Sequence, residues 1–176
     1  MKRNIILIGM PGAGKSTLGV LIAKILGMDY LDTDIFIQKR EGKLLQEIID
    51  EKGSEYFAQA EENALLAIDC ENTVIATGGS AVYSEAGMTK LRENGTVVYL
   101  SITPETMVSR IHNLETRGIL FKPGETLLDM FAYRVPFYER YCDITVDCNG
   151  NEMVESAEAI IKYVSGLNLE VSELNS

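Results

Sequence analysis

The chain has 176 residues, of which 46% are hydrophobic, and a formal net charge of −10 at pH 7. This length and apolar content are typical of one domain with a large core and do not require a second domain. The acidic balance argues against nucleic acid or an anionic membrane surface as the main partner, because both of these bind basic protein faces.

The cysteines and the start of the chain bear on its location. Cys70, Cys142 and Cys148 are odd in number and lack metal-site spacing, which indicates free thiols in a reducing compartment. A strand pattern follows Met1 almost directly, with no signal peptide and no apolar run long enough to span a bilayer. We therefore expect a cytoplasmic, monomeric protein without membrane contact.

The first strand and helix enclose a phosphate-binding motif. Residues 9–17, Gly-Met-Pro-Gly-Ala-Gly-Lys-Ser-Thr, lie between an apolar run at Asn4–Ile8 and a helical pattern at Lys15–Leu26. In this context G-x-x-x-x-G-K-[ST] predicts a nucleotide site, because glycines let backbone N–H groups turn toward phosphate. Lys15 can reach the outer phosphates, and the Ser16 hydroxyl is placed to bind Mg²⁺. The predicted nucleotide-binding residues of this loop are Gly12, Ala13, Gly14, Lys15, Ser16 and Thr17.

A second strand pattern at Asp29–Leu31 is followed by Asp32-Thr33-Asp34 and a helical pattern at Asp34–Glu41. Ligands of open parallel sheets bind beyond the carboxyl ends of the strands, which is where these aspartates lie. Asp32 is expected to hold Mg²⁺, directly or through water, and Asp34 to orient or deprotonate an acceptor hydroxyl. The alternative is that one of them only caps the following helix.

Helical patterns at Leu44–Asp50 and Ser54–Asp69 lead to a third strand pattern at Thr73–Ala76. Gly78 and Gly79 follow this strand. Their backbone N–H groups can approach a substrate closely, although the pair could also form a plain turn. We therefore predict part of an acceptor site here.

The second half of the chain continues the alternation of strands and helices. The expected elements are a helix at Ser84–Glu93, a strand at Thr96–Ser101, a helix at Pro104–His112, a helix at Thr126–Arg140, a strand at Ile144–Val146 and a helix at Met153–Val164. Between them, the loss of periodicity over 113–125 predicts a lid. The pattern favours one domain over 1–165 with helices on both faces of a parallel sheet, and a flexible polar tail over 166–176.

Taken together, these motifs resemble the shikimate kinase family over residues 4 to 164. The resemblance rests on the phosphate loop, Asp-Thr-Asp at 32–34, Thr-Gly-Gly-Ser-Ala-Val at 77–82, Val-Val-Tyr-Leu at 97–100, a lid arginine and Arg-Val-Pro-Phe-Tyr at 134–138. It implies an α/β fold of the P-loop NTPase class, a nucleoside-monophosphate-kinase-like three-layer sandwich with a five-stranded parallel sheet and a lid. It also implies ATP- and Mg²⁺-dependent phosphorylation of shikimate, in aromatic amino acid biosynthesis.

The same resemblance implies roles for individual residues. A closing loop can deliver a planar cation to the transferring phosphoryl group, which supports a catalytic role for the lid arginine. The implied roles are catalysis by Lys15, Asp34 and Arg117, metal binding by Ser16 and Asp32, a phosphate contact by Arg117, an adenine contact by Arg110, and substrate binding by Asp34, Gly78, Gly79 and Arg134.

Two departures from the family pattern fall on the acceptor side. The family usually carries Gly-Glu-x-x-Phe-Arg-x-x-Glu, in which the arginine binds the shikimate carboxylate, but here that position is Ala58. Losing a charge-assisted hydrogen bond costs about 1.5 to 3 kcal/mol, or roughly ten- to a hundredfold in affinity or turnover. The third glycine of the family's Gly-Gly-Gly is also replaced, by Ser80.

Three functions follow as hypotheses. The first is a kinase of a small hydroxylated acceptor, with shikimate the leading candidate. The second is a diverged kinase of the same family that acts on another hydroxylated metabolite. The third is a non-catalytic ATP-binding regulator, but a mere binder needs neither Asp34 nor Arg117. Nucleotide kinases are disfavoured because the acceptor helices are acidic.

Overall fold

The computed structural model describes residues 4–111, 124–150 and 153–174. Its sheet has five parallel strands: β1 (Asn4–Ile8), β2 (Asp29–Asp32), β3 (Thr73–Ala76), β4 (Gly95–Ser101) and β5 (Ile144–Asp147). Their order is β2-β3-β1-β4-β5. The chain leaves β1 in one direction for β2 and β3 and in the other for β4 and β5, so a crevice forms beside β1 where ligands of such sheets bind. The predicted five-stranded parallel sheet is confirmed.

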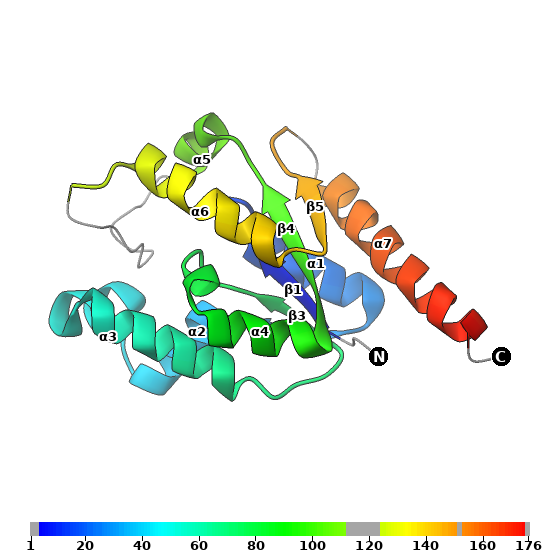
Figure 1. The fold of residues 1–176 in the computed structure, drawn as a ribbon, viewed down its shortest axis with the longest axis horizontal. Helices are drawn as coiled ribbons and strands as arrows, with labels where there is room; N and C mark the ends of the chain where they lie inside the picture. Colours follow the sequence, from blue (N-terminus) through cyan, green and yellow to red (C-terminus); the bar gives the residue numbers. More distant parts are fainter. Residues whose placement is uncertain (1–3, 112–123, 151–152, 175–176) are drawn as a thin grey trace.

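Helices cover both faces of this sheet. They are α1 (Lys15–Leu26), α2 (Thr33–Glu41), α3 (Leu45–Ala67), the short 3₁₀ helix η1 (Ala81–Tyr83), α4 (Glu85–Asn94), α5 (Pro104–Arg110), α6 (Leu127–Tyr141) and α7 (Met153–Leu174). Helices α1 and α7 pack together on one face, and α4 and α6 pack on the other (Figure 1). The three-layer sandwich that was predicted is therefore present.

The centre of the sheet is apolar because both of its faces are covered. All five residues of β1 are buried, and β1 lies between the buried strands β3 and β4. Continuous apolar strands are expected where helices pack on both sides of a parallel sheet. The phosphate loop therefore starts from a fully buried strand at the centre of the sheet.

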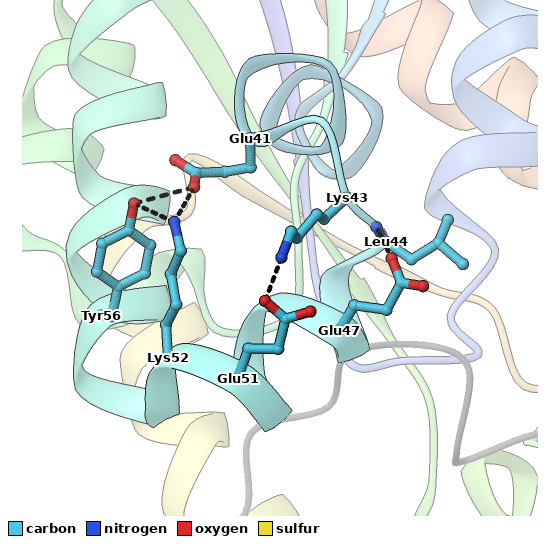
Figure 2. A network of polar contacts seen from close by, with 7 residues as sticks. All are labelled: Glu41, Lys43, Leu44, Glu47, Glu51, Lys52 and Tyr56. Atoms are coloured by element: carbon cyan, nitrogen blue, oxygen red, sulfur yellow. Dashed lines mark hydrogen bonds and ion pairs between the residues drawn. The ribbon is translucent and has the colours of Figure 1, made fainter.

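Helix α3 is broken at Gly53, whose φ of 84° and ψ of 166° are not helical. The two helical patterns predicted on either side of this residue are thus confirmed. Glu41, at the end of α2, accepts hydrogen bonds from Lys52 Nζ at 3.0 Å and from the Tyr56 hydroxyl at 2.9 Å (Figure 2). Because Lys52 and Tyr56 flank the break, these contacts join both halves of α3 to the end of α2.

The end of the chain differs from the expected helix boundary. Helix α7 runs to Leu174, past Val164, where the pattern predicted its end. The boundary was placed too early because polar residues such as Ser165 do not by themselves stop a helix. Flexibility of residues 166–176 stays a prediction. The predicted lid at 113–125 lies outside the described residues except for Gly124 and Glu125.

Within the described ranges, we find no helix with both the length and the apolar character needed to cross a membrane.

Candidate functional site

A cavity of about 450 Å³ lies at the carboxyl ends of the central strands. It is formed by the phosphate loop, α2, both halves of α3, the turn after β3, Arg110 of α5 and Arg134 of α6. The predicted site residues that line it are Gly12, Gly14, Lys15, Ser16, Thr17, Asp34, Gly78, Gly79, Arg110 and Arg134. The fold thus brings most of the predicted donor and acceptor residues to one cavity.

Three predicted site residues are placed otherwise. The Ala13 methyl group is buried, and its amide N–H donates to the Met10 carbonyl at 3.1 Å, so this residue shapes the loop from within. Asp32 lies beside Ser16 and is not part of the cavity lining. Arg117 lies outside the described residues.

The phosphate loop has the backbone shape that its glycines predict. Gly12 and Gly14 have φ angles of 84° and 92°, in the left-handed region that favours glycine. Helix α1 begins at Lys15, and no side chain caps its N-terminus. The N–H groups of a first helical turn have no partner within the helix, and together with the helix dipole they bind anions.

Lys15 is buried within this loop. Its Nζ donates to the Gly9 carbonyl oxygen at 2.7 Å and to the Met10 carbonyl oxygen at 2.9 Å. These bonds hold the ammonium group at the floor of the cavity. A lysine in this position can move a short distance to meet the outer phosphates of a nucleotide.

Asp32 caps α2, as the alternative interpretation of this residue predicted, and it also lies beside the Ser16 hydroxyl. Its Oδ1 accepts hydrogen bonds from the amides of Asp34 at 3.0 Å and Ile35 at 3.4 Å, which caps α2. Its Oδ2 accepts from Ser16 Oγ at 2.8 Å and from the Tyr30 hydroxyl at 3.1 Å. One carboxylate oxygen therefore serves the helix, and the other lies next to the Ser16 hydroxyl.

The oxygen atoms of Ser16 and Asp32 are hard donors of the type that Mg²⁺ prefers. In phosphoryl-transfer sites Mg²⁺ is held by one or two protein groups, with phosphate and water oxygens completing the shell. No group of three His, Cys, Asp or Glu side chains that could hold a metal occurs in the described part of the chain. The Ser16–Asp32 pair fits a magnesium ion that arrives with a nucleotide.

Asp34 is one of two carboxyl groups, with Glu61, that line the cavity. Its burial, and secondarily the charge of Asp32, raises its pKa to about 6, whereas the Lys15 ammonium group opposes this shift. A carboxylate with this pKa is ionised at neutral pH and can accept a proton or a hydrogen bond from a hydroxyl group. The environment of Asp34 therefore suits the base or orienting role predicted for it.

Gly78 is required for a reason other than the one predicted. Its N–H, expected to face a substrate, donates instead to Thr33 Oγ1 at 3.0 Å. A Cβ atom at Gly78 would lie 2.7 Å from Asp34 Oδ1 and 2.7 Å from Glu61 Oε1. The missing side chain is therefore what allows these two carboxyl groups to approach the strand end.

Glu61 is a cavity residue to which the sequence motifs gave no predicted role. It is 3% exposed, and its Oε2 accepts a hydrogen bond from Ser80 Oγ at 2.7 Å. Its Oε1 is buried and has no hydrogen-bond partner among the described residues. Burial, and secondarily Asp34, raises the pKa of Glu61 to about 7, against the opposing effects of Ser80 and Arg134. Glu61 matches the final glutamate of the family pattern Gly-Glu-x-x-Phe-Arg-x-x-Glu, in which Ala58 takes the place of the arginine. This match was the signal that could have identified it.

Arg134 lies behind the glycine turn and is 1% exposed. Its Nε donates to the Tyr83 hydroxyl at 2.9 Å, and its guanidinium carbon lies 5.3 Å from the centre of the Tyr83 ring. A Cβ atom at Gly79 would lie 3.0 Å from an Arg134 terminal nitrogen, so the turn and the cation are in close contact. The cavity therefore has a buried positive charge beside the glycine turn, held in place by Tyr83.

Arg110 connects the phosphate loop to the segment after β5. Its guanidinium group donates to the Gly12 carbonyl at 3.4 Å, to the Cys148 carbonyl at 2.9 Å and to the Asn149 carbonyl at 3.3 Å. This places its planar group at the edge of the cavity beside the loop.

Ala58 lies in an adjoining hollow of about 300 Å³ rather than in the main cavity. This hollow shares Glu61 and Ser80 with the main cavity. Because Ala58 is three residues before Glu61 on α3, the two side chains lie on the same helix face. A long side chain at position 58 would start from this hollow, which Glu61 also lines.

Comparison with known proteins gives consistent matches across the chain. The sequence profile described as Shikimate kinase matches residues 11–165. The shikimate kinase of Caldanaerobacter subterraneus subsp. tengcongensis is 34% identical over 163 residues, covering 91% of this chain and 95% of the relative. That of Histophilus somni is 36% identical over 172 residues, covering 96% and 98%.

A solved structure extends this similarity to three dimensions. The shikimate kinase of Acinetobacter baumannii in complex with shikimate has a TM-score of 0.87 and 29% identity, and the match covers 95% of both chains.

Proposed function

This chain belongs to the shikimate kinase family, whose members are ATP-dependent kinases that phosphorylate a hydroxyl group, and we propose that it transfers the γ-phosphoryl group of ATP to a hydroxyl group of shikimate. One observation carries the proposal: a single cavity contains the phosphate loop with Lys15 and, facing it, the Asp34 carboxylate and the Arg134 guanidinium group. A phosphate donor and an anionic, hydroxylated acceptor can therefore meet in one place.

At the donor end, the open N–H groups of α1 bind the ATP phosphates, and Lys15 exchanges its two carbonyl partners for phosphate oxygens. Ser16 and Asp32 would hold Mg²⁺, which would supply positive charge to neutralise the phosphates. Arg110 contacts the adenine base. We assign Arg117, in the segment predicted as a lid, to the transferring phosphoryl group.

At the acceptor end, the oxygen of the acceptor hydroxyl group attacks the γ-phosphorus, and Asp34 accepts the proton of this hydroxyl group. The bond from that phosphorus to the bridging oxygen breaks, and ADP leaves with the electron pair. Arg134 binds the acceptor carboxylate, and Gly78 and Gly79 form the floor on which the acceptor lies. The proposed catalytic residues are thus Lys15, Asp34 and Arg117.

A second acceptor is a specific alternative because Ala58 removes one positive charge from the acceptor side, and Ser80 adds a hydroxyl group there. A hydroxylated metabolite with a smaller or differently placed anionic group would then be preferred over shikimate.

The test is an ADP-release assay with Mg²⁺ and ATP against shikimate, quinate, gluconate and simple polyols. We expect shikimate to give the highest kcat/KM. A clear preference for another compound would support the diverged kinase. Tight ATP binding without acceptor-stimulated ADP release would contradict catalysis and favour the regulatory hypothesis. Sedimentation of the purified protein tests the expected monomer.

A further inference from the structure

We propose that Glu61 binds the acceptor directly in this chain, and that the Ser80 hydroxyl group positions its carboxyl group so that Oε1 contacts the acceptor. This inference rests on the proposed function of the same cavity.

The geometry of Glu61 carries the proposal. The side chain lines the cavity, and its two oxygen atoms have different surroundings. Oε2 accepts the Ser80 hydrogen bond at 2.7 Å, whereas Oε1 is buried without a hydrogen-bond partner among the described residues. Buried polar atoms without partners are unfavourable and uncommon in folded proteins. A bound ligand is one means of satisfying Oε1.

The position of Oε1 favours the acceptor as this ligand. Oε1 and Asp34 Oδ1 lie at equal distances, 2.7 Å, from the position that a Gly78 Cβ atom would occupy. The two carboxyl groups thus meet over one glycine at the acceptor end of the cavity. A small hydroxylated molecule that contacts Asp34 is within reach of Glu61 as well.

The Ser80 hydrogen bond determines which oxygen of Glu61 can donate. Because the Ser80 hydroxyl donates to Oε2, the proton of the acid form lies on Oε1 and faces the acceptor. Burial raises the pKa of Glu61 to about 7, so the acid form is well populated at neutral pH. Protonated Glu61 can donate to a carboxylate or hydroxyl oxygen, whereas ionised Glu61 repels a carboxylate.

The charged and titratable groups around Glu61 are few. Asp34 from α2 and Arg134 from α6 act on its charge, and Lys15 lies in the same cavity. Glu55, Glu62 and Tyr83 line the adjoining hollow. No lysine or arginine occurs from Gly53 to Asp69, so α3 offers Glu61 no basic partner downstream of its break. The Ser80 hydroxyl is its partner instead.

The first measurement is the KM for shikimate at saturating Mg²⁺ and ATP between about pH 6 and about pH 8.5, where a free carboxylate stays ionised. In the unchanged chain we expect KM to rise with pH through about 7, because Glu61 loses its donor, while kcat changes less. Glu61→Gln should keep KM low and abolish the rise of KM through about pH 7, because its amide N–H is a permanent donor. Glu61→Ala should raise KM about tenfold or more at low pH.

Ser80→Ala tests the positioning role. A hydrogen bond to an ionised carboxylate lowers its pKa, so removing Ser80 should move the rise in KM to higher pH. KM at low pH should also increase, because the orientation of Glu61 is then less fixed. Glu62→Gln is the matched control, since Glu62 is the neighbouring residue and accepts a similar bond from Ser84 Oγ at 2.7 Å. This control should keep the pH profile of the unchanged chain.

The second measurement does not depend on turnover. The ¹³C resonance of the Glu61 carboxyl group, assigned by its loss in Glu61→Gln, is followed against pH in the ligand-free protein and again with shikimate and Mg²⁺-ADP. We expect a midpoint near 7 and a shift of the resonance when shikimate is added. A resonance that shikimate leaves unchanged, or an unchanged shikimate KM in Glu61→Ala, would overturn the proposal. A resonance shift without ADP release would reject the proposed function and retain the binding role.

Discussion

Ser16 and Asp32 are joined by a hydrogen bond of 2.8 Å from the Ser16 hydroxyl to Asp32 Oδ2, although one residue lies in the first turn of α1 and the other ends β2. The other oxygen of Asp32 caps α2. The carboxylate is therefore fixed by backbone on one side and turned toward the phosphate loop on the other. This arrangement separates the structural role of Asp32 from its proposed role in metal binding.

Asp32→Asn should impair use of magnesium more than folding. Asparagine caps helices about as well as aspartate, so the melting temperature should change little. The loss of the negative charge should raise the Mg²⁺ concentration for half-maximal activity about tenfold or more, as for other groups that support a bound metal. ADP release against free Mg²⁺ at saturating ATP gives this value. An unchanged Mg²⁺ dependence would remove Asp32 from the metal site.

Lys15→Ala should abolish ADP release or reduce it by about a hundredfold or more, because a positive charge that stabilises the transferring phosphates is lost. It should also lower the free energy of unfolding by about 1 to 2 kcal/mol, because the Gly9 and Met10 carbonyls lose a shared donor. Lys24→Ala, at the exposed end of the same helix, is the control. Full turnover in Lys15→Ala would exclude the phosphate-loop mechanism.

Gly78→Ala should impair acceptor binding and leave ATP binding intact. The new methyl group would lie 2.7 Å from oxygens of Asp34 and Glu61, and both carboxyl groups would have to move. We expect the shikimate KM to rise at least about tenfold, since displacement of positioning groups has effects of this size or larger. Gly166→Ala, where the methyl group meets nothing within 4 Å, is the matched control. An unchanged KM would mean that the two carboxyl groups do not contact the acceptor.

Ala58→Arg should lower the shikimate KM about ten- to a hundredfold, because a second cation would reach the acceptor carboxylate. Ala58→Met is the companion variant, since it fills the same hollow without charge. Equal gains in both variants would show that packing, rather than charge, limits acceptor binding. High shikimate affinity in the unchanged chain, with no gain from arginine, would mean that Ala58 does not weaken acceptor binding.

Glu61 should make the protein less stable as pH rises from about 4.5 to 7. Its pKa is near 4.5 when unfolded and about 7 when folded, so the native state binds more protons in this interval. The free energy of unfolding then falls with pH, by roughly 3 kcal/mol at most for this group. Urea unfolding at about pH 5 and about pH 8 measures the change. Glu61→Gln should show a smaller decrease, and an identical decrease would mean that Glu61 does not titrate here.

The fold was predictable where the pattern of apolar residues and glycines along the chain matches the burial and backbone conformation of those residues in the structure. The apolar run Asn4–Ile8 lies in the centre of the sheet, and the glycines at 12 and 14 adopt the left-handed backbone that the motif requires. The predicted break between the helical patterns at 44–50 and 54–69 falls at Gly53. In each case neighbours in sequence provide most of the constraint.

The site was harder to predict where distant partners decide a role. The Gly78 amide was expected to face a substrate, but it donates a hydrogen bond to the Thr33 hydroxyl. Thr33 precedes α3 in the sequence, whereas Gly78 follows it. Glu61 was missed because a glutamate on a helix usually faces water. Its burial follows from the packing of α3 against η1, which places Ser80 beside it. Helical periodicity alone does not indicate such tertiary contacts, and only the match of Glu61 to the family pattern pointed to this residue.

The break at Gly53 has a consequence for engineering the specificity of this chain. The donor residues belong to the phosphate loop after β1, to α1 and to α5, whereas the wall that carries Ala58 and Glu61 starts anew after the break, where Tyr56 holds it to Glu41 of α2. Residues 54 to 61 can therefore be exchanged as one segment with the corresponding residues of a relative. Such chimaeras would vary the acceptor while every chimaera keeps the same ATP site.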